Sequence, residues 1–471
     1  MHQKTRVAIV GAGSAGLSAV SEIRKLTDDF LLINAGPYGT TCARVACMPS
    51  KALIEIANAF HHRNRFETMG IRGADAVRAD VPAVLRRVRQ LRDGFVSGVV
   101  ESTEALGDKN VRGRARFLEP NVLEVEGRVI EAERIVLATG SSPVVPEPWQ
   151  ALGNRVFTSD EIFERDDLPR RVAVVGLGAV GLELAQAMAR LGGEVTGLDT
   201  ARTLGGLTDP RVAEVLVETL EREFAVHLGQ EAEPELRGNE LWIAIGERRI
   251  PVDAVLMAVG RRPNLDDLGL EALGVELGEG GVPRFDPETL QVGDLPVFLA
   301  GDANGHRPIL HEVADEGRIA GYGAVRDDGT CFARRVPLRL TFCSPNAAVA
   351  GTAWGQLPEA DVVVGAADFG GQGRARMAGQ DRGTLRVYAS SPEGTVLGAE
   401  MAVPAGEHLA HLVAWAVDRG ETVWSLLRKP FYHPTYEEGL RSALQDAAAQ
   451  LEGPGSAELL LCEAAPHEAL C

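Results

Sequence analysis

Two copies of one glycine motif constrain the fold of this chain more than any other feature. Each copy follows a short apolar stretch that is typical of a buried strand, RVAIV at residues 6–10 and VAVV at residues 172–175. In GxGxxG spacing, the first glycine allows a tight turn, the second lets the backbone approach a pyrophosphate, and the third packs a helix on the strand. The six glycines are Gly11, Gly13, Gly16, Gly176, Gly178 and Gly181. We therefore predict an α/β chain with two Rossmann-like nucleotide-binding domains, the first with a helix from Ser14 to about Leu26.

The residue about 20 positions after each motif distinguishes the two nucleotide sites. In the second unit the strand EVTGLD ends on Asp199, which can accept both ribose hydroxyls and repel a 2′-phosphate. This favours NAD over NADP, although Arg202 lies close by. In the first unit the strand FLLIN ends on Asn34, which can bond a ribose but carries no charge.

Three further apolar stretches end in glycine turns. LATGSSP and LMAVGRRPN contain Gly140 and Gly260, and VFLAGDA places Asp302 after another strand. These turns fit the flavin site of a dinucleotide-binding domain. Each of them alone is equally explained as an ordinary exit from a strand.

The stretch GTTCARVACMPSK holds Cys42 and Cys47. On an unbroken helix their Cα atoms would be about 8 to 9 Å apart, beyond the roughly 7 Å limit for a disulfide. Pro49 is tolerated only in a first turn, so we expect a helix to begin near Met48, with both cysteines on its distorted approach. A helix start also lowers a thiol pKa. The pair is thus a candidate redox centre, and two buried structural cysteines are the alternative.

The composition narrows the class of protein. A chain of 471 residues forms several domains, and 48 Lys and Arg against 66 Asp and Glu give a net charge of −18. This charge disfavours nucleic acid and anionic membranes as partners. The absence of an apolar signal core and of a long apolar run predicts a cytoplasmic protein with no membrane span. Six cysteines do not make a disulfide scaffold, so a proximal pair in a reducing compartment is more often catalytic.

Taken together, the two glycine motifs, the cysteine stretch and YHPTYEEGL near the C-terminus resemble the pyridine nucleotide disulfide oxidoreductases, and within them the dihydrolipoamide dehydrogenases. The resemblance extends from about Val7 to Leu451. It implies two Rossmann-like domains, for FAD and NAD, followed by a C-terminal α+β dimerisation domain. It also implies an obligate homodimer.

By that resemblance each candidate residue has an expected role. Cys47 would be the thiolate facing the flavin, and Cys42 the thiol that exchanges with substrate. His433 with Glu438 would be the acid–base pair reaching into the partner subunit's site, and histidine is the side chain suited to carry a thiol proton at neutral pH. The expected cofactor-binding residues are Gly11, Gly13, Gly16, Asn34, Gly140, Gly260 and Asp302 for FAD, Lys51 and Glu183 beside the flavin ring, and Gly176, Gly178, Gly181 and Asp199 for NAD.

The implied reaction is oxidation of a dithiol by a Cys42–Cys47 bridge, with electrons passing to FAD and then to NAD. The dithiol could be a lipoyl group on a carrier protein. Two alternatives stay open: NADH-dependent reduction of another small disulfide or of a metal ion, and a redox-responsive flavoprotein with little turnover. No metal-ligand cluster is predicted.

Several positions depart from the family pattern. Arg44 and Ala46 stand where Asn and Gly are common, and Phe431 stands where a second histidine is frequent. Arg44 could favour an anionic substrate, or it could be a solvated surface arginine. These departures leave the substrate open.

We expect the FAD domain at residues 1–146 and 264–334, the NAD domain at 147–263 and the interface domain at 335–451. Alternating strand patterns at residues 384–390 and 395–403 support the last of these. A tail at 452–471 contains Cys462 and Cys471, nine residues apart. These thiols could relay electrons to a bulky substrate or be incidental in a poorly ordered end.

Overall fold

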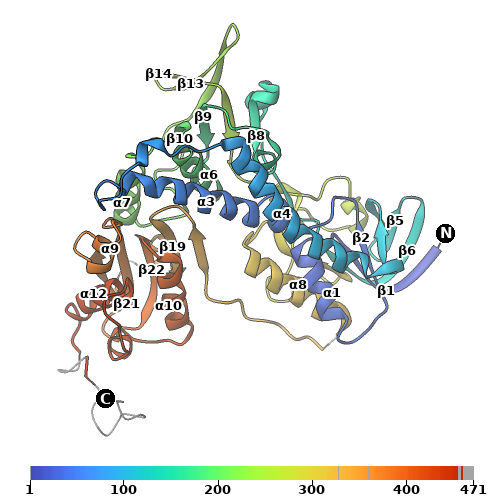
Figure 1. The fold of residues 1–471 in the computed structure, drawn as a ribbon. Helices are drawn as coiled ribbons and strands as arrows, with labels where there is room; N and C mark the ends of the chain where they lie inside the picture. Colours follow the sequence, from blue (N-terminus) through green and yellow to red (C-terminus); the bar gives the residue numbers. More distant parts are fainter. Residues whose placement is uncertain (1, 327, 359, 454–457, 460–471) are drawn as a thin grey trace. The chain divides into compact units, whose positions relative to one another are not determined.

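The structure is a computed structural model that describes residues 2–326, 328–358, 360–453 and 458–459 (Figure 1). The chain divides into two compact units, each built from three separate segments. The first unit contains the residues up to Leu53 together with Asp80–Leu168 and Val259–Arg334. The second contains Ile54–Ala79, Pro169–Ala258 and the residues from Arg335 onward. The division into three domains and a tail that the sequence predicts is finer than this and remains a prediction.

A seven-stranded sheet forms the centre of the first unit. Its strands lie in the order β3-β2-β1-β6-β5-β4, and β17 pairs with β6 outside this path. The pairs among β3, β2, β1, β6 and β17 are parallel, and β4 and β5 run antiparallel to their neighbours. The strands are β1 (His2–Val10), β2 (Phe30–Asn34), β3 (Asn110–Arg112), β4 (Ala115–Glu119), β5 (Val122–Val125), β6 (Arg128–Leu137) and β17 (Val297–Leu299).

Helices α1 (Ser14–Ile23) and α8 (Leu310–Val325) pack directly against each other in this unit (Figure 1). A Cβ atom on Gly317 would lie 2.2 Å from the Ala15 carbonyl oxygen, so only glycine permits this approach. Helix α1 ends three residues before the predicted Leu26, because the Leu26 N–H bonds to the Ile23 carbonyl in a tighter turn. The other elements of the unit are α2 (Thr41–Arg44), α4 (Val81–Glu104), β7 (Ser141–Pro143), α5 (Glu147–Gln150), β8 (Val156–Thr158) and β16 (Arg261–Pro263). Helix α3 (Cys47–His61) runs from the first unit into the second.

The second unit contains a second parallel sheet, in which β11, β10, β9 and β15 lie in this order. Helix α6 follows β9 and helix α7 follows β10, as in a Rossmann unit. The predicted strand EVTGLD is β10. The elements of this part are β9 (Arg171–Val175), α6 (Ala179–Arg190), β10 (Glu194–Asp199), α7 (Pro210–Leu220), β11 (Ala225–Leu228), an antiparallel sheet of β12 (Glu233–Arg237), β13 (Glu240–Ile245) and β14 (Arg248–Val252), and β15 (Ala254–Met257).

A five-stranded antiparallel sheet in the order β18-β19-β22-β21-β20 completes the second unit. Helices α10 and α12 contribute to the same apolar core as its strands. The strands predicted at 384–390 and 395–403 are confirmed as β21 and β22, and so is the fold class. The elements are β18 (Leu338–Thr341), β19 (Asn346–Gly351), β20 (Val362–Asp368), α9 (Gly373–Met377), β21 (Thr384–Ser390), β22 (Val396–Val403), α10 (Gly406–Asp418), α11 (Val423–Leu427) and α12 (Glu437–Ala448).

A buried polar network ties α7 to this antiparallel sheet. The carboxylate of Glu400, which is fully buried, accepts the backbone N–H groups of Thr208 and Asp209 at 2.7 and 2.8 Å. The carboxylate of Asp209 is also fully buried. Arg386 Nη1 donates to its two oxygens at 2.6 and 2.7 Å, and the Tyr388 hydroxyl donates to one of them at 2.8 Å. Each buried charge therefore has partners, as burial of a carboxylate requires.

Candidate functional site

Cys42 and Cys47 lie on two short stretches of helix separated by a break. Cys42 is on α2, where the Thr40 side chain caps the helix by accepting the Ala43 N–H at 3.2 Å. Cys47 is the first residue of α3, one position before the predicted start. Both cysteines are in the thiol form, with no disulfide between them, and both are half-buried. The helix break places the two sulfurs as neighbours, which an unbroken helix could not do.

The two thiols do not titrate independently. The pKa of Cys42 is raised, first because its thiol hydrogen-bonds to Cys47, and then because it is partly buried and lies near the Cys47 charge. Lys51, one turn along α3 from Cys47, acts on this pKa in the opposite direction. For Cys42 these effects outweigh any lowering of the pKa by a helix start. The pair favours one negative charge over two.

Arg44 is half-buried, and its Nε atom is shielded from solvent without a hydrogen-bond partner among the described residues. It is therefore more enclosed than a solvated surface arginine would be. A guanidinium N–H buried without an acceptor costs free energy. This leaves a donor beside the cysteine stretch.

The first glycine motif has the geometry that a nucleotide-binding loop requires. Gly11 has φ +112°, and a Cβ atom on Gly16 would lie 1.9 Å from the Gly11 carbonyl oxygen. Helix α1 begins after Gly13 with no side-chain cap, so its first N–H groups are available to a phosphate. Asn34 Oδ1 accepts the Ala12 N–H at 3.2 Å, and its Nδ2 donates to the Gly36 carbonyl at 2.8 Å. The amide thus joins the glycine loop to the turn after β2.

The second glycine motif repeats this geometry at α6. Gly176 has φ +93°, a Cβ atom on Gly181 would lie 1.9 Å from the Gly176 carbonyl oxygen, and α6 also lacks a side-chain cap. No atom lies within 4 Å of the Cβ position of Gly178, so the space above this loop is open. The Asp199 carboxylate accepts the Leu177 N–H at 2.6 Å and the Ala201 N–H at 2.8 Å. It therefore lies against the loop at the end of β10.

Three stretches that are far apart in the sequence meet around Asp302 in the first unit. The Ser141 hydroxyl donates to Asp302 Oδ2 at 2.7 Å and accepts from Arg261 Nε at 2.9 Å. Arg261 also pairs with Asp160 at 2.8 Å. The turns at Gly140 and Gly260, with φ +74° and +120°, lead into the paired strands β7 and β16 that hold these side chains.

Glu316 on α8 fixes the turn that contains Asp302. Its buried carboxylate accepts the Gly301 N–H and the Asn304 side-chain amide, both at 2.7 Å. Sequence reasoning missed Glu316, Ser141 and Arg261. Ser141 and Arg261 directly follow the predicted turn glycines, so their position offered a signal, whereas Glu316 offered none beyond its place on a helix.

Glu183 lies on α6 in the second unit and is almost completely buried. Its carboxylate accepts the Phe342 N–H at 2.9 Å. Lys51 belongs to the first unit.

His433 and Glu438 form a hydrogen-bonded pair in the second unit. Nδ1 of His433 lies 3.0 and 3.1 Å from the two carboxylate oxygens of Glu438, and the Thr435 N–H donates to the same carboxylate at 3.2 Å. The hydrogen bond from His433 is the main reason that the pKa of Glu438 is lowered. The imidazole is 78% exposed, so its other nitrogen can receive a proton from outside this unit.

A family model described as pyridine nucleotide-disulphide oxidoreductase matches residues 5–317, and a model described as the dimerisation domain of these proteins matches residues 338–444. The chain belongs to this family. The pyridine nucleotide-disulphide oxidoreductases of the dihydrolipoyl dehydrogenase type use FAD and NAD(H), so the two expected cofactors are confirmed.

Individual members of the family resemble the chain over almost its full length. The dihydrolipoyl dehydrogenase of Haloferax volcanii is 30% identical over 468 residues, which cover 95% of this chain and 97% of the relative. The mercuric reductase of Staphylococcus aureus is 27% identical over 454 residues, or 92% of this chain and 81% of the relative. The solved Cu(II) complex of the HOCl-induced flavoprotein disulfide reductase RclA from Escherichia coli has a TM-score of 0.83 at 22% identity, covering 94% of this chain and 99% of that one. This last similarity concerns the fold alone.

Some sequence predictions concern features elsewhere in the chain. Cys462 and Cys471 lie outside the described residues. No helix among the described residues is long and apolar enough to span a membrane. Within the same residues, no group of three or more His, Cys, Asp or Glu side chains is arranged to hold a metal ion.

Proposed function

We propose that this protein is an NAD-linked thiol–disulfide oxidoreductase of the dihydrolipoyl dehydrogenase type. Its substrate would be a dithiol such as a lipoyl group, either free or attached to a carrier protein. The observation that carries this proposal is the thiol pair formed by Cys42 on α2 and Cys47 at the start of α3, coupled by a hydrogen bond and influenced by Lys51. The similarity to curated dihydrolipoyl dehydrogenases supports the choice of substrate.

The cysteine chemistry balances without further reactants. A substrate thiolate attacks the Cys42 sulfur of an oxidised Cys42–Cys47 bridge, and Cys47 leaves as a thiolate. The second substrate thiolate then attacks the substrate sulfur bound to Cys42, which closes the substrate disulfide and releases Cys42. The raised pKa of Cys42 favours its leaving as a thiol while Cys47 keeps the negative charge. The substrate loses two electrons and two protons, and the bridge gains the electrons.

His433 is the proposed acceptor of the substrate thiol protons. Glu438 holds the Nδ1 side of the ring, so Nε2 is left to face a thiol, as in other carboxylate-oriented histidines. The model of the family's dimerisation domain matches residues 338–444 of this chain, which include His433. We therefore propose a homodimer in which His433 of the partner subunit lies beside the cysteines.

The cofactor sites follow from the loops described above. The first glycine loop with Asn34, Asp302 and the residues around Gly140 and Gly260 would hold FAD, with Lys51 and Glu183 beside the ring. The second loop with Asp199 would hold NAD. When bound, the flavin and the nicotinamide supply the electron-pair and hydride transfer that protein side chains cannot. The Asp199 carboxylate would repel a 2′-phosphate, so we expect preference for NAD over NADP.

The test is a Cys47→Ser variant assayed with dihydrolipoamide and NAD. We expect FAD to stay bound and dithiol oxidation to fall to background, since one thiol cannot form the bridge. The matched control is Cys331→Ser, which alters an exposed free thiol and should keep full activity. Full activity of the Cys47→Ser variant would refute the proposal.

A second candidate is reduction of another small disulfide or of a metal ion by NADH. The half-buried, partly unbonded Arg44, two residues from Cys42, favours an anionic disulfide such as glutathione disulfide over a metal cation. The similarity to a mercuric reductase is what supports a metal ion. Turnover of the wild-type enzyme with lipoamide, glutathione disulfide and Hg²⁺ would separate the two candidates. If none of them turns over while NADH still bleaches the flavin, the protein is a low-turnover redox-responsive flavoprotein.

A further inference from the structure

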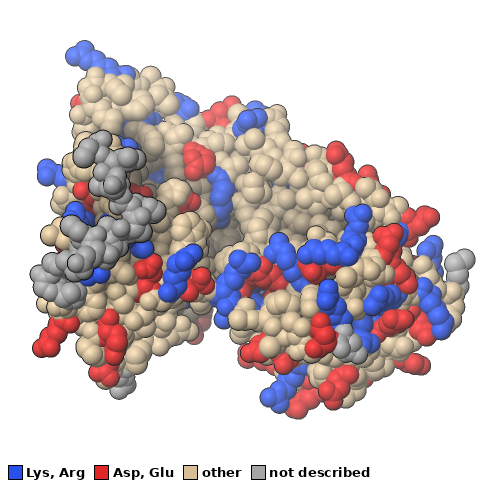
Figure 2. All heavy atoms as spheres, turned by 90° about the horizontal axis from the view of Figure 1, so that it is seen from below, with Lys and Arg blue, Asp and Glu red and all other residues tan. Residues whose placement is uncertain are grey.

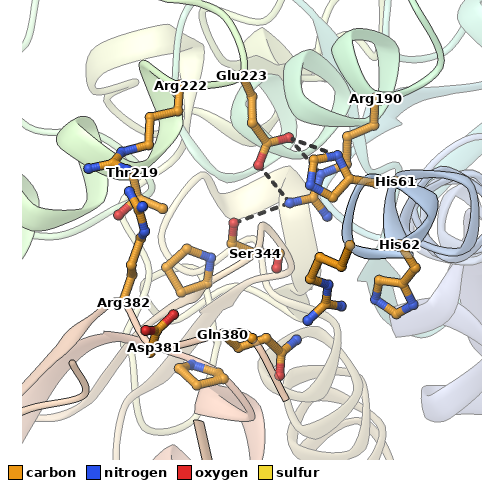
Figure 3. Close-up of a pocket in the computed structure, with 14 residues that line it drawn as sticks. His61, His62, Arg190, Thr219, Arg222, Glu223, Ser344, Gln380, Asp381 and Arg382 are labelled. Atoms are coloured by element: carbon orange, nitrogen blue, oxygen red, sulfur yellow. Dashed lines mark hydrogen bonds and ion pairs between the residues drawn. The ribbon is translucent and has the colours of Figure 1, made fainter. Parts of the chain in front are cut away.

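The second unit contains a cavity of about 250 Å³ (Figure 3). None of its lining residues belongs to either glycine loop. Its wall is formed by the last residue of α3 and the turn after it, the C-terminal ends of α6 and α7, and the loops that follow β18 and α9. We call it the basic cavity, because its charged lining residues are Arg65, Arg190, Arg222, Arg382, Glu223 and Asp381, with His61 and His62 beside them. Four positive and two negative charges leave a formal charge of +2.

The main acidic group in the wall is already neutralised. Glu223 accepts from Arg190 Nε and Nη2, both at 2.7 Å, and from the Gln186 amide at 2.9 Å. Both of its oxygens are thus occupied by a bidentate pair, the strongest type of ion pair between side chains. Glu223 therefore neutralises the charge of Arg190, and it does not neutralise the charges of the other arginines in the wall.

The charged lining residues outside the Arg190–Glu223 pair are Arg65, Arg222, Arg382 and Asp381, which together carry a formal charge of +2. Arg222 and Arg382 are the two that converge. Figure 3 shows their side chains extending toward one another beside Thr219. They come from distant parts of the sequence, one just after α7 and the other just before β21. Two guanidinium groups that converge repel each other unless an anion lies between them. Arg65 adds a third guanidinium, held in the wall by a hydrogen bond to the Ala378 carbonyl.

The pKa values of the two histidines respond to this positive environment. The pKa values of His61 and His62 are lowered, in both cases mainly by burial and then by nearby arginines, Arg190 for His61 and Arg65 for His62. Both imidazoles therefore favour the neutral form and can donate or accept hydrogen bonds at the cavity wall without adding charge.

The cavity contrasts with the rest of the molecule. The chain has a net charge of −18, and basic and acidic side chains lie interspersed on the face in Figure 2. At physiological ionic strength charges are screened beyond about 8 Å, so the chain's overall charge does not cancel a local group of arginines. The volume is below the roughly 300 to 1,000 Å³ of a drug-sized ligand site, so the occupant is small.

We propose that the basic cavity binds a small phosphorylated anion, with Arg222 and Arg382 as its principal ligands. The planar fork of a guanidinium matches two phosphate oxygens at once, and a diphosphate would present oxygens to both arginines. This is a site separate from the redox centre and from both dinucleotides. Its existence does not depend on the proposed function.

The experiment is calorimetric titration of the FAD-loaded protein with inorganic pyrophosphate at fixed ionic strength. Saturating NAD is present so that both glycine loops are filled. We expect binding with a Kd of about 1 mM or tighter, and a loss of roughly tenfold or more in affinity for Arg222→Ala and for Arg382→Ala. The matched control is Arg419→Ala, an exposed arginine at the C-terminal end of α10, which removes the same charge from the same unit and should leave the affinity unchanged.

Three results would overturn the proposal. Binding that falls equally in Arg419→Ala, or that neither cavity variant changes, would mean that pyrophosphate responds only to overall charge or binds elsewhere. Equal affinity for tricarballylate, a tricarboxylate, would show that the cavity selects charge alone and not phosphate. Because the readout is binding, a failure here is distinct from a failure of dithiol oxidation.

Discussion

The acid–base role proposed for His433 and Glu438 predicts how a single substitution changes turnover. We expect His433→Gln to lower dithiol turnover by about 10²- to 10⁴-fold, the usual contribution of a positioned acid–base group. NADH oxidation by ferricyanide, which transfers no thiol proton, should keep its rate. Steady-state assays with the two acceptors check this.

The chain offers a matched control for that variant. His408 lies 3.6 Å from Glu407 in a second, exposed histidine–glutamate pair, so His408→Gln removes a similar pair without touching YHPTYEEGL. Its turnover should equal that of the wild type. A comparable loss in both variants would mean that the effect of His433→Gln is structural.

At the residue scale, sequence reasoning succeeded where a motif is local and failed where a partner is distant. The spacing of Cys42, Cys47 and Pro49 was enough to predict the helix break, because its cause lies within a few residues. The raised pKa of Cys42 was not predictable, because it depends on a hydrogen bond that only the folded break creates. The uncharged Asn34 was recognised as a departure, but its two bonds to Ala12 and Gly36 required coordinates.

At the scale of elements, replacing a glycine by alanine is expected to have opposite effects on stability in helices α8 and α4. In α8 a Cβ atom on Gly317 would lie 2.2 Å from the Ala15 carbonyl oxygen, whereas nothing lies within 4 Å of that position on Gly94 in α4. Gly317→Ala should therefore lower the free energy of unfolding by about 1–3 kcal/mol through overpacking. Gly94→Ala should raise it by about 0.5–1 kcal/mol through helix propensity. Denaturant unfolding of both variants measures the contrast, and two changes of the same sign would contradict it.

Elements with a regular pattern were the predictable part of the fold. Strands β10 and β21 were found at the predicted residues, because alternation or a continuous apolar run fixes them locally. The contact of Ser141 with Asp302 joins residues 161 positions apart, and Glu316 reaches its turn from another helix. Such contacts depend on topology, which periodicity does not specify.

For the whole molecule, the network around Asp209 predicts a dependence of stability on alkaline pH. Burial is the main reason that the pKa of Tyr388 is raised, with Glu400 and Asp209 adding to it. Because the unfolded chain loses the Tyr388 proton near pH 10 and the folded chain keeps it, this contribution is complete below pH 10. Above it, stability should fall by up to about 1.4 kcal/mol per pH unit.

Urea unfolding midpoints between pH 8 and 11 test this expectation. Tyr388→Phe should reduce the alkaline decline, and it should lower stability at pH 8 because Asp209 loses a buried donor. Tyr432→Phe is the control, since Tyr432 is 82% exposed, and its curve should follow the wild type. An unchanged decline in Tyr388→Phe would contradict the assignment.

The proposed homodimer predicts complementation between two inactive variants. In a Cys47→Ser subunit paired with a His433→Gln subunit, one of the two sites has an intact cysteine pair and an intact histidine. Co-expression with random pairing should restore about a quarter of the wild-type rate, since half of the dimers are mixed and each has one working site. Turnover of the purified mixture measures this, and activity at background would indicate that each subunit uses its own histidine.

The three-segment construction of the first unit has a consequence for biosynthesis. Strand β1 and helix α1 leave the ribosome early, but α8, which covers α1, is encoded about 300 residues later. At roughly 5–20 residues per second, the apolar surface at Ala15 and Ala19 waits for about 15 to 60 s before its covering helix is made. We therefore expect chaperones to bind the nascent chain during translation, and truncated products that stop before α8 to be degraded by proteases faster than the full chain.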